Sequence, residues 1–479
     1  MTRVPILILC IPALAAAQSR RDRWPPPLPP APASAASVPA ALNAPVPSSP
    51  PALPPITDDE LRTQLRATSE LLARHEAELR ELRAALSAKA TPLPTPPPPD
   101  ATSQHWYEKL AIRGYLQVRY NQIPSGVDNP NLVNDQGDKS IGGTGGIFIR
   151  RARLILFGDV HPRVSVYIQP DFANSISDQL HIGMLRDFYA DVFLDRKKEF
   201  RFRVGQSKIP FGFENMQSSQ NRIALDRSDA LNSAAPNERD LGLFFYWAPA
   251  HIRSRFKYLV DSGLKGSGDF GVVGIGAYNG QSINRPELNK YPHVVARVTW
   301  PFAIGNQILE VGGGGYYGNF TVKLENAKDG TKFTAAESDL SLRDARGHVS
   351  VVLYPQPVGV AFEYNVGVGP SLGADAESTV VDSRLLYGGY LQLMAKFDRV
   401  AHTVSMIPYL RGSMYDGGKK HFTNAPRYRT RELELGIEWQ LMKAFEIVAA
   451  YMLADRTSDK YPYQQEYGHV TRLHAQVNY

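Results

Sequence analysis

Arginine recurs at alternate positions in short apolar segments of this 479-residue sequence. Arg201 and Arg203 alternate with Phe202 and its apolar neighbours, and Arg151 and Arg153 repeat the pattern. A period of two predicts β-strands with one apolar and one cationic face. A guanidinium is permanently charged, and its planar set of donors fits phosphate oxygens. These spacings therefore predict a surface that attracts and binds small anions.

A long polar connection, residues 209–239, follows the segment around Arg203 and carries further cations. If this connection folds into a lumen enclosed by strands, we expect Arg201, Arg203, Arg151 and Arg153 to converge with its cations on one constriction. The candidate anion-binding residues, in the lumen and the connection, are Arg113, Arg119, Arg151, Arg153, Arg163, Arg201, Arg203, Lys208, Arg222, Arg227, Arg239 and Arg297. The alternative is that acidic residues on the same faces pair with them and leave a nearly neutral wall.

The composition argues against an enzyme. The single cysteine, Cys10, lies in a segment expected to be removed, so no disulfide, thiolate metal site or cysteine nucleophile is predicted. The eleven histidines are scattered, and neither Gly-x-Ser-x-Gly nor His-Glu-x-x-His occurs. A net charge of +6 is spread along the chain rather than concentrated in one run. We predict no enzyme activity, cofactor, metal site or nucleic-acid partner.

The N-terminal part predicts four segments. Residues 1–17 resemble a secretory signal, and residues 18–56 form a Pro- and Ala-rich tether that cannot bury a core. Residues 57–90 carry a heptad seam through Leu65, Leu72 and Leu79, which predicts a short coiled-coil helix, with a lone amphipathic helix as the alternative. The Pro-rich residues 91–105 form a linker.

Residues 106–479 predict an all-β fold. Period-two segments persist to the C-terminus, and tight connections alternate with long ones, as in outer-membrane barrels. Both barrel ends should lie on one side, so the strand number should be even, and we predict a 16-stranded antiparallel transmembrane β-barrel in which 255–260 is not a strand. The tight connections are 160–162, 195–198, 355–357, 399–400 and 442–443; the long ones are 122–146, 173–184, 209–239, 321–345, 369–383, 415–427 and 455–466.

Several motifs in fixed order resemble the family of phosphate- and polyphosphate-selective porins. They are Arg150-Arg151-Ala152-Arg153-Leu154, the run from Val204 to Glu214, Asp226-Arg227-Ser228, the run from Pro236 to Gly242, and Ala277-Tyr278-Asn279-Gly280. The resemblance implies a trimeric outer-membrane porin of sixteen strands, in which lumen arginines and lysines guide phosphate. Such porins also include members with a coiled coil ahead of the barrel.

Together these observations predict a porin for passive diffusion of small anions, phosphate or polyphosphate among them. The alternatives are a general, weakly selective diffusion porin and a structural barrel linked to the cell wall. We expect the outer membrane of a Gram-negative bacterium, with the N-terminal segment in the periplasm. The expected partners are small inorganic anions, membrane lipid, further copies in a homotrimer, and the cell wall through the N-terminal segment.

Overall fold

The computed structural model describes residues 58–89, 105–122, 146–176, 179–373, 378–401, 404–458 and 464–479. It contains two compact units, Met1–Pro99 and Asp100–Tyr479. The expected signal segment 1–17, the tether 18–56 and nearly all of the linker 91–105 lie outside the described residues. No helix in the described ranges is both long enough and apolar enough to cross a membrane.

The described part of the N-terminal unit is one helix, α1 (Asp58–Lys89). Its first turn is acidic, which stabilises the N-terminal end of the helix dipole. Leu65, Leu72 and Leu79 of the heptad seam are exposed by 72%, 66% and 56% in the single chain. The expected helix is therefore present, and the coiled-coil partner that would cover this seam stays a prediction.

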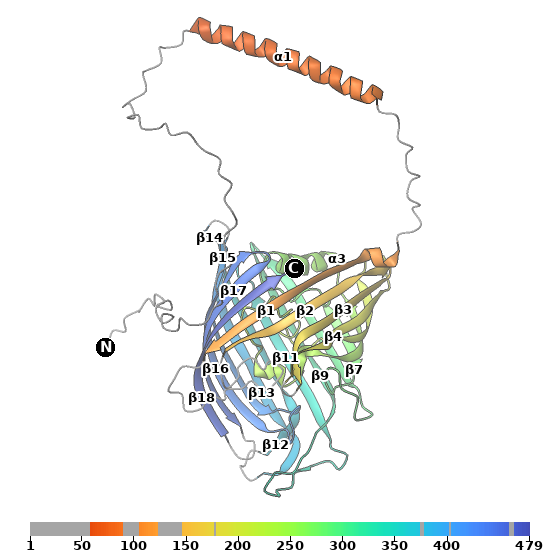
Figure 1. Cartoon of the computed structure of the whole chain (residues 1–479). Helices are drawn as coiled ribbons and strands as arrows, with labels where there is room; N and C mark the ends of the chain where they lie inside the picture. The colour runs from red at the N-terminus through yellow and green to blue at the C-terminus, as the bar shows by residue number, and fades with distance from the viewer. Residues whose placement is uncertain are drawn as a thin grey trace, which may run out of the picture. The chain divides into compact units, whose positions relative to one another are not determined.

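The second unit is a barrel of long antiparallel strands, drawn in Figure 1. Sixteen long strands lie within its described residues, and two short ones accompany them: β10 (Thr334–Ala335) and β14 (Phe397–Ala401). The long strands are β1 (Leu110–Gln122), β2 (Gly146–His161), β3 (Val164–Ile176), β4 (Gln179–Phe193), β5 (Phe200–Lys208), β6 (Arg239–Trp247), β7 (Val273–Tyr278), β8 (His293–Ile304), β9 (Gln307–Thr321), β11 (Ser341–Leu353), β12 (Val358–Leu372), β13 (Val380–Ala395), β15 (Val404–Gly418), β16 (Arg427–Met442), β17 (Phe445–Ser458) and β18 (Gln464–Asn478).

The last long strand closes the barrel by pairing with the first. β18 is antiparallel to β1, in a register that runs from Tyr115↔Asn478 to Gln122↔Thr471. Consecutive long strands pair around the wall, with β14 forming only a short hairpin beside β15. The closed barrel of sixteen long strands confirms the predicted number and leaves no free sheet edge.

Short turns gather at one rim, here called the turn end, and most long connections at the other, the loop end. Met442↔Phe445 and His161↔Val164 are the last pairs before two of the turns. One predicted long connection, 173–184, is wrong, because β3 continues to Ile176 and β4 starts at Gln179. Register shifts interrupt the β3–β4 pairing, so the period of two breaks although the strands continue.

One connection at the turn end contains a helix, α3 (Ala250–Asp261), near the rim that carries the C-terminus (Figure 1). Ile252, Phe256 and Leu259 share its buried side and pack in the main apolar cluster. This spacing follows the helical period. The segment 255–260 is therefore helix rather than strand, which confirms its exclusion from the strand count.

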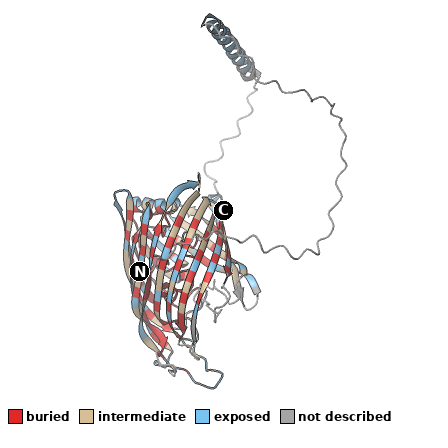
Figure 2. Cartoon of the chain, turned by 90° about the vertical axis from the view of Figure 1, so that its left-hand side faces the viewer, coloured by how far each residue is buried: buried red, intermediate tan, exposed pale blue. Residues whose placement is uncertain are grey.

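Burial alternates along the strands, visible as bands of different colour on the ribbons in Figure 2. On β16, Glu434 and Glu438 are buried, whereas Leu433 and Leu435 are exposed by 46% and 58%. The outer face is thus apolar, as lipid contact requires.

We expect Leu435→Arg to lower the free energy of unfolding by about 2–4 kcal/mol, because an arginine near the bilayer midplane loses its hydration. The sequence also assigns Val166, Val192 and Ile437 to this lipid-facing set. Urea-induced unfolding in lipid vesicles measures the change, with Leu435→Ala as the uncharged control. Unchanged stability together with altered conductance would place Leu435 in the lumen instead.

Candidate functional site

The connection between β5 and β6, residues 209–238 and here called the inner loop, folds into the lumen. Almost every one of its residues is buried. Phe211, Phe213, Ile223 and Leu225 of this loop join one apolar cluster with wall residues. The wall contributes tyrosines, namely Tyr246, Tyr316, Tyr354, Tyr390 and Tyr409. Burial of the loop's apolar side chains therefore holds it inside, as the hypothesis of an inward connection required.

Polar contacts fix the inner loop to the wall formed by β11, β12 and β15. The backbone N–H groups of Phe213 and Glu214 donate to the Glu363 carboxylate at 2.7 and 3.0 Å. Arg411 donates to both Glu214 carboxylate oxygens at 2.7 and 3.1 Å. Arg346 donates to Ser233 Oγ at 2.6 Å. Because buried polar groups are costly when unpaired, these contacts specify one loop position.

A second anchor lies near the seam where β18 meets β1. The Asp226 carboxylate accepts from Arg119 Nη1 at 3.1 Å and also from Arg472. Arg119 Nη2 donates to the carbonyl of Leu225 at 3.0 Å. The predicted residue Arg119 thus positions the inner loop, and its charge is compensated by a carboxylate.

Between the inner loop and strands β2 to β6 lies a group of eight cationic side chains, here called the cation cluster. Six arginines line one small cavity with Asn237 and Glu238, and Lys208 and Arg222 contact the same Glu238. The members of the cation cluster are Arg150, Arg151, Arg153, Arg186, Lys208, Arg222, Arg227 and Arg239.

Carboxylates from the described strands and the inner loop contact the cation cluster. Asp171 lies 2.8 Å from Arg153 Nε and 3.5 Å from Arg186 Nε. Asp187 accepts from Arg239 Nε at 2.9 Å. Together with Glu238, these are the carboxylates that the described contacts place against the eight cationic side chains.

Glu238 is the shared partner of half the cation cluster. Its carboxylate lies 3.2 Å from Arg227 Nε, 2.6 Å from Arg239 Nη1 and 3.4 Å from Lys208 Nζ, and it also contacts Arg222. Lys208 Nζ donates in addition to the carbonyls of Asn215 and Met216 at 2.9 and 3.2 Å. One carboxylate therefore holds four cations of the inner loop and its flanking strands in place.

Two β-bulges place extra arginines in this cluster. Along β1 and β2, Gln117 pairs with Arg151 but Val118 pairs with Ile149, so Arg150 is the additional residue. Along β3 and β4 the register shifts between Gln169 and Pro170, and Arg186 is the additional residue there. A bulge can direct toward the lumen a side chain that a strict period of two would place on the lipid-facing surface. Both bulge arginines line the cavity beside their inward neighbours.

The structure places the predicted site residues in separate regions. Arg151, Arg153, Lys208, Arg222, Arg227 and Arg239 meet in the cation cluster. Arg201 and Arg203 do not line its cavity, since they lie on β5 toward the turn end. Arg203 forms a two-bond pair with Asp191 at 2.7 and 2.8 Å, and Arg201 contacts Asp269 at 3.0 Å. The expected convergence of Arg201 and Arg203 with Arg151 and Arg153 is therefore wrong, because Asp269 and Asp191 hold the first pair toward the turn end, whereas Arg153 contacts Asp171 and Arg151 contacts Gln117.

Three other predicted residues also lie apart from the cation cluster. Arg163 is exposed in the turn between β2 and β3, and Arg113 is exposed near the turn end of β1. Arg297 is buried on β8, with Nη2 at 3.6 Å from Glu310. None of the three lines the cavity of the cation cluster.

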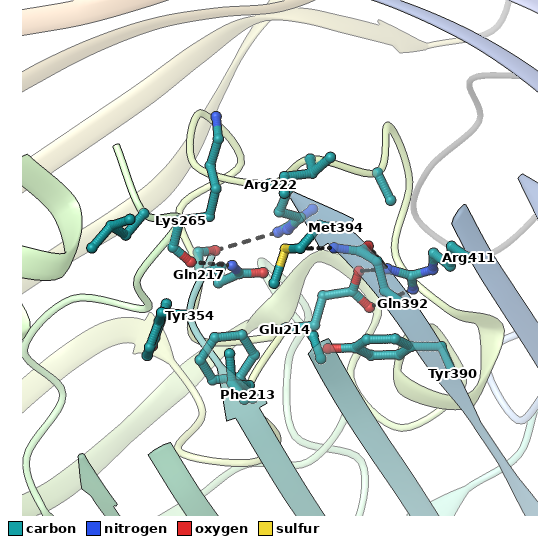
Figure 3. Close-up of a pocket in the computed structure, with 15 residues that line it drawn as sticks. Phe213, Glu214, Gln217, Arg222, Lys265, Tyr354, Tyr390, Gln392, Met394 and Arg411 are labelled. Atoms are coloured by element: carbon teal, nitrogen blue, oxygen red, sulfur yellow. Dashed lines mark hydrogen bonds and ion pairs between the residues drawn. The ribbon is translucent and has the colours of Figure 1, made fainter. Parts of the chain in front are cut away.

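On its other side, the inner loop borders a second small cavity, shown in Figure 3. Arg411 lies over the Tyr390 ring, 3.9 Å from its centroid, and is paired with Glu214. Lys265 is paired with Glu438 and lies 3.6 Å from Glu446. Burial alone would lower the pKa of Lys265. The combined effect of the two carboxylates is larger and raises the pKa above its ordinary value. Cations and acids balance more closely here than in the cation cluster.

The alternation rule missed Arg150 and Arg186 for a physical reason. It assigns neighbouring residues to opposite faces, so each charged doublet, Arg150-Arg151 and Arg186-Asp187, would send one charge into lipid. Such a charge costs about 2–4 kcal/mol near the bilayer midplane. A charged doublet inside a membrane strand is thus a sequence signal for a bulge. Arg411, Arg456 and Arg472 were missed although they keep to the period of two.

The chain was compared with protein families and with known proteins. The model of the family "Phosphate-selective porin O and P" matches residues 126–380, more than half of the chain. No curated protein matches. Among solved structures, the outer-membrane channel DcaP of Acinetobacter baumannii has 12% identity and a TM-score of 0.47, covering 77% of this chain and 97% of its own. An anion-selective porin from Comamonas acidovorans has 9% identity and a TM-score of 0.45, with coverages of 77% and 99%.

Proposed function

The chain belongs to the family of phosphate-selective porins O and P, and from this premise we propose that it passes small anions, phosphate among them, along the cation cluster. Porins of this family are non-enzymatic channels of the outer membrane. The observation that carries the proposal is the gathering of eight cationic side chains beside the inner loop. An anion that reaches this zone meets guanidinium groups already held in place, so it gains charge-assisted hydrogen bonds without ordering the site.

The position of the cation cluster in the lumen strengthens its attraction for anions. The inner loop narrows the space beside the cation cluster, and low-dielectric walls strengthen the field of each charge. The Nε of Arg186 lies 3.5 Å from Asp171 but forms no hydrogen bond among the described residues, whereas its Nη groups donate to Asn174 and Asn237 at 2.8 Å each. A phosphate oxygen in this cavity would supply the missing acceptor.

A general, weakly selective porin is the second candidate, favoured by the balanced charges on the other side of the inner loop. There Arg411 is paired with Glu214, and Lys265 with Glu438. If ions pass mainly on that side, the cation cluster contributes little to selectivity. Phosphate competition separates the two candidates.

Reversal potential across a planar bilayer tests the proposal. In a KCl gradient we expect a potential of the sign that marks anion preference, and added phosphate should reduce the chloride current as it occupies the cation cluster. Sulfate at equal ionic strength controls for screening. A reversal potential near zero, with no effect of phosphate beyond that of sulfate, would favour the general porin.

We also propose that α1 forms a periplasmic coiled coil which reinforces a homotrimer, because its leucine seam is exposed in the single chain. Deleting residues 57–90 should lower the melting temperature of the trimer and leave single-channel conductance unchanged. Gel mobility on heating and bilayer recordings measure both effects. A deletion without effect on melting, with a monomeric isolated helix, would reduce the segment to a spacer toward the cell wall.

A further inference from the structure

A second segment, besides the inner loop, enters the lumen. It is the connection from α3 to β7, residues 262–272, here called the strap. Leu264 and Lys265 of the strap are exposed by only 4% and 6%, so its middle lies inside the barrel rather than on the rim. Lys265 Nζ lies 2.5 Å from Glu438 on β16 and 3.6 Å from Glu446 on β17. The strap is therefore attached to the wall at two places.

The two places of attachment lie on opposite sides of the barrel. The strap belongs to the connection between β6 and β7, whereas Glu438 and Glu446 belong to the neighbouring strands β16 and β17. Six long strands separate these two pairs in each direction around the wall. They are β8, β9, β11, β12, β13 and β15 one way, and β5, β4, β3, β2, β1 and β18 the other. The strap and the side chain of Lys265 thus reach across the width of the lumen.

Further contacts fix the strap at its middle and at its end. Gln217 of the inner loop donates to the carbonyl oxygen of Lys265 at 2.6 Å, so the two inward segments are joined (Figure 3). Asp269 accepts from Arg201 Nη1 of β5 at 3.0 Å and from Arg253 Nε of α3 at 2.8 Å. The end of the strap is thus held at the wall near β7, and its middle is held by Lys265 alone and by the inner loop.

Little space remains beside the strap. The cavity that borders Lys265 holds about 20 Å³, and the cavity that borders Glu446 holds about 10 Å³. A single water molecule requires about 10–15 Å³. Neither cavity therefore admits a phosphate ion while the strap keeps this position.

The backbone of the strap is suited to movement. Lys265 has a φ of 66°, in the left-handed region that residues other than glycine rarely adopt. Gly263 and Gly268 flank it with φ values of 64° and 88°, and glycine rotates between such conformations without steric cost. The strain at Lys265 persists because its side chain and its carbonyl oxygen are both held. Release of these contacts would relieve the strain.

We propose that the strap is a gate of the channel, and that the ion pair of Lys265 with Glu438 and Glu446 holds this gate closed. The inference rests on the proposed function as a channel and adds a movement that must precede the passage of ions. When the pair breaks, the three charged groups regain hydration, and the strap turns on its glycines and opens the lumen beside the inner loop. Because the pair is buried, removal of one partner leaves an uncompensated charge and disfavours the closed position.

Single-channel recording in a planar bilayer tests the gate. Lys265→Glu places a third carboxylate beside Glu438 and Glu446 and should raise the ratio of open to closed time about tenfold. Lys265→Glu combined with Glu438→Lys restores a pair of opposite charges, so the ratio should return to that of the wild type. Lys257→Glu is the matched control, because it makes the same change in charge at an exposed residue of α3, and it should behave as the wild type does.

A reversible cross-link makes the test independent of charge. Lys265→Cys is combined with Glu438→Cys, and Cys10, the single cysteine of the sequence, is replaced by serine. A bis-methanethiosulfonate reagent that bridges the two introduced thiols should close the channel. Reduction should reopen the same molecule, which a variant with a damaged fold would not do.

Equal ratios of open to closed time in Lys265→Glu, Lys257→Glu and the wild type would overturn the gate, as would a current that does not respond to the cross-link. The reversal potential in the same recordings separates this inference from the proposed function. Anion preference with unchanged gating would remove the gate and leave the anion channel, whereas altered gating without anion preference would do the reverse. Absence of current from every variant would remove both.

Discussion

Arg150→Glu combined with Arg186→Glu is expected to abolish the preference for anions. The two changes lower the formal charge of the cation cluster by four units, because each replaces a positive by a negative side chain. A unit charge at roughly 7 Å contributes about 0.6 kcal/mol even at the dielectric constant of water. Four units, reduced by salt screening, amount to about 2 kcal/mol for a monovalent ion, roughly a thirtyfold fall in anion permeability. The effect on a cation has the opposite sign, so the ratio of anion to cation permeability should fall by more than this factor. Reversal potential in a KCl gradient measures this ratio.

Lys328→Glu combined with Lys332→Glu is the matched control, because it makes the same change in net charge on exposed residues of the connection between β9 and β11. It should shift the permeability ratio only slightly at physiological salt, since exposed charges are screened over about 8 Å. Equal shifts in the two double variants would mean that total charge, rather than the cation cluster, sets selectivity.

The fold could be predicted from sequence because the bilayer enforces a strict pattern. Every strand must present apolar residues to lipid, so alternation such as that of Leu433, Leu435 and Ile437 against Glu434 and Glu438 persists around the wall. Both ends should lie at one rim, so the number of strands is even, and excluding 255–260 as a strand gave sixteen. The errors fall where local register changes, as at the 173–184 connection.

The site was less predictable, because a strand pattern gives the face of a side chain but neither its height nor its partner. Arg201 and Arg203 have the same sequence signature as Arg151 and Arg153, yet Asp269 and Asp191 hold them apart from the cation cluster. The inner loop adds cations whose positions depend on its apolar contacts with the opposite wall. Such long-range packing leaves no periodic trace in the sequence.

Glu238→Gln is expected to have opposite effects on stability and on anion affinity. Lys208, Arg227 and Arg239 would lose their shared charged partner. Removing one partner from a buried ionic network costs about 3–5 kcal/mol, because uncompensated charges remain. The melting temperature in dilute chloride should therefore fall. The same change raises the formal charge of the cluster by one unit, so phosphate should bind more tightly than to the wild type.

The stabilisation of the folded state by bound phosphate provides a way to measure the predicted gain in anion affinity. A ligand that binds only the folded state adds about 2.7 kcal/mol of stability at a hundred times its dissociation constant. Phosphate should therefore restore more of the melting temperature in Glu238→Gln than it adds to the wild type, when compared with chloride at equal ionic strength. Glu337→Gln, at an exposed residue between β9 and β11, controls for the loss of one acid. An equal gain from phosphate in all three proteins would show that phosphate acts on the whole surface, and the cation cluster would then be a structural network that holds the inner loop.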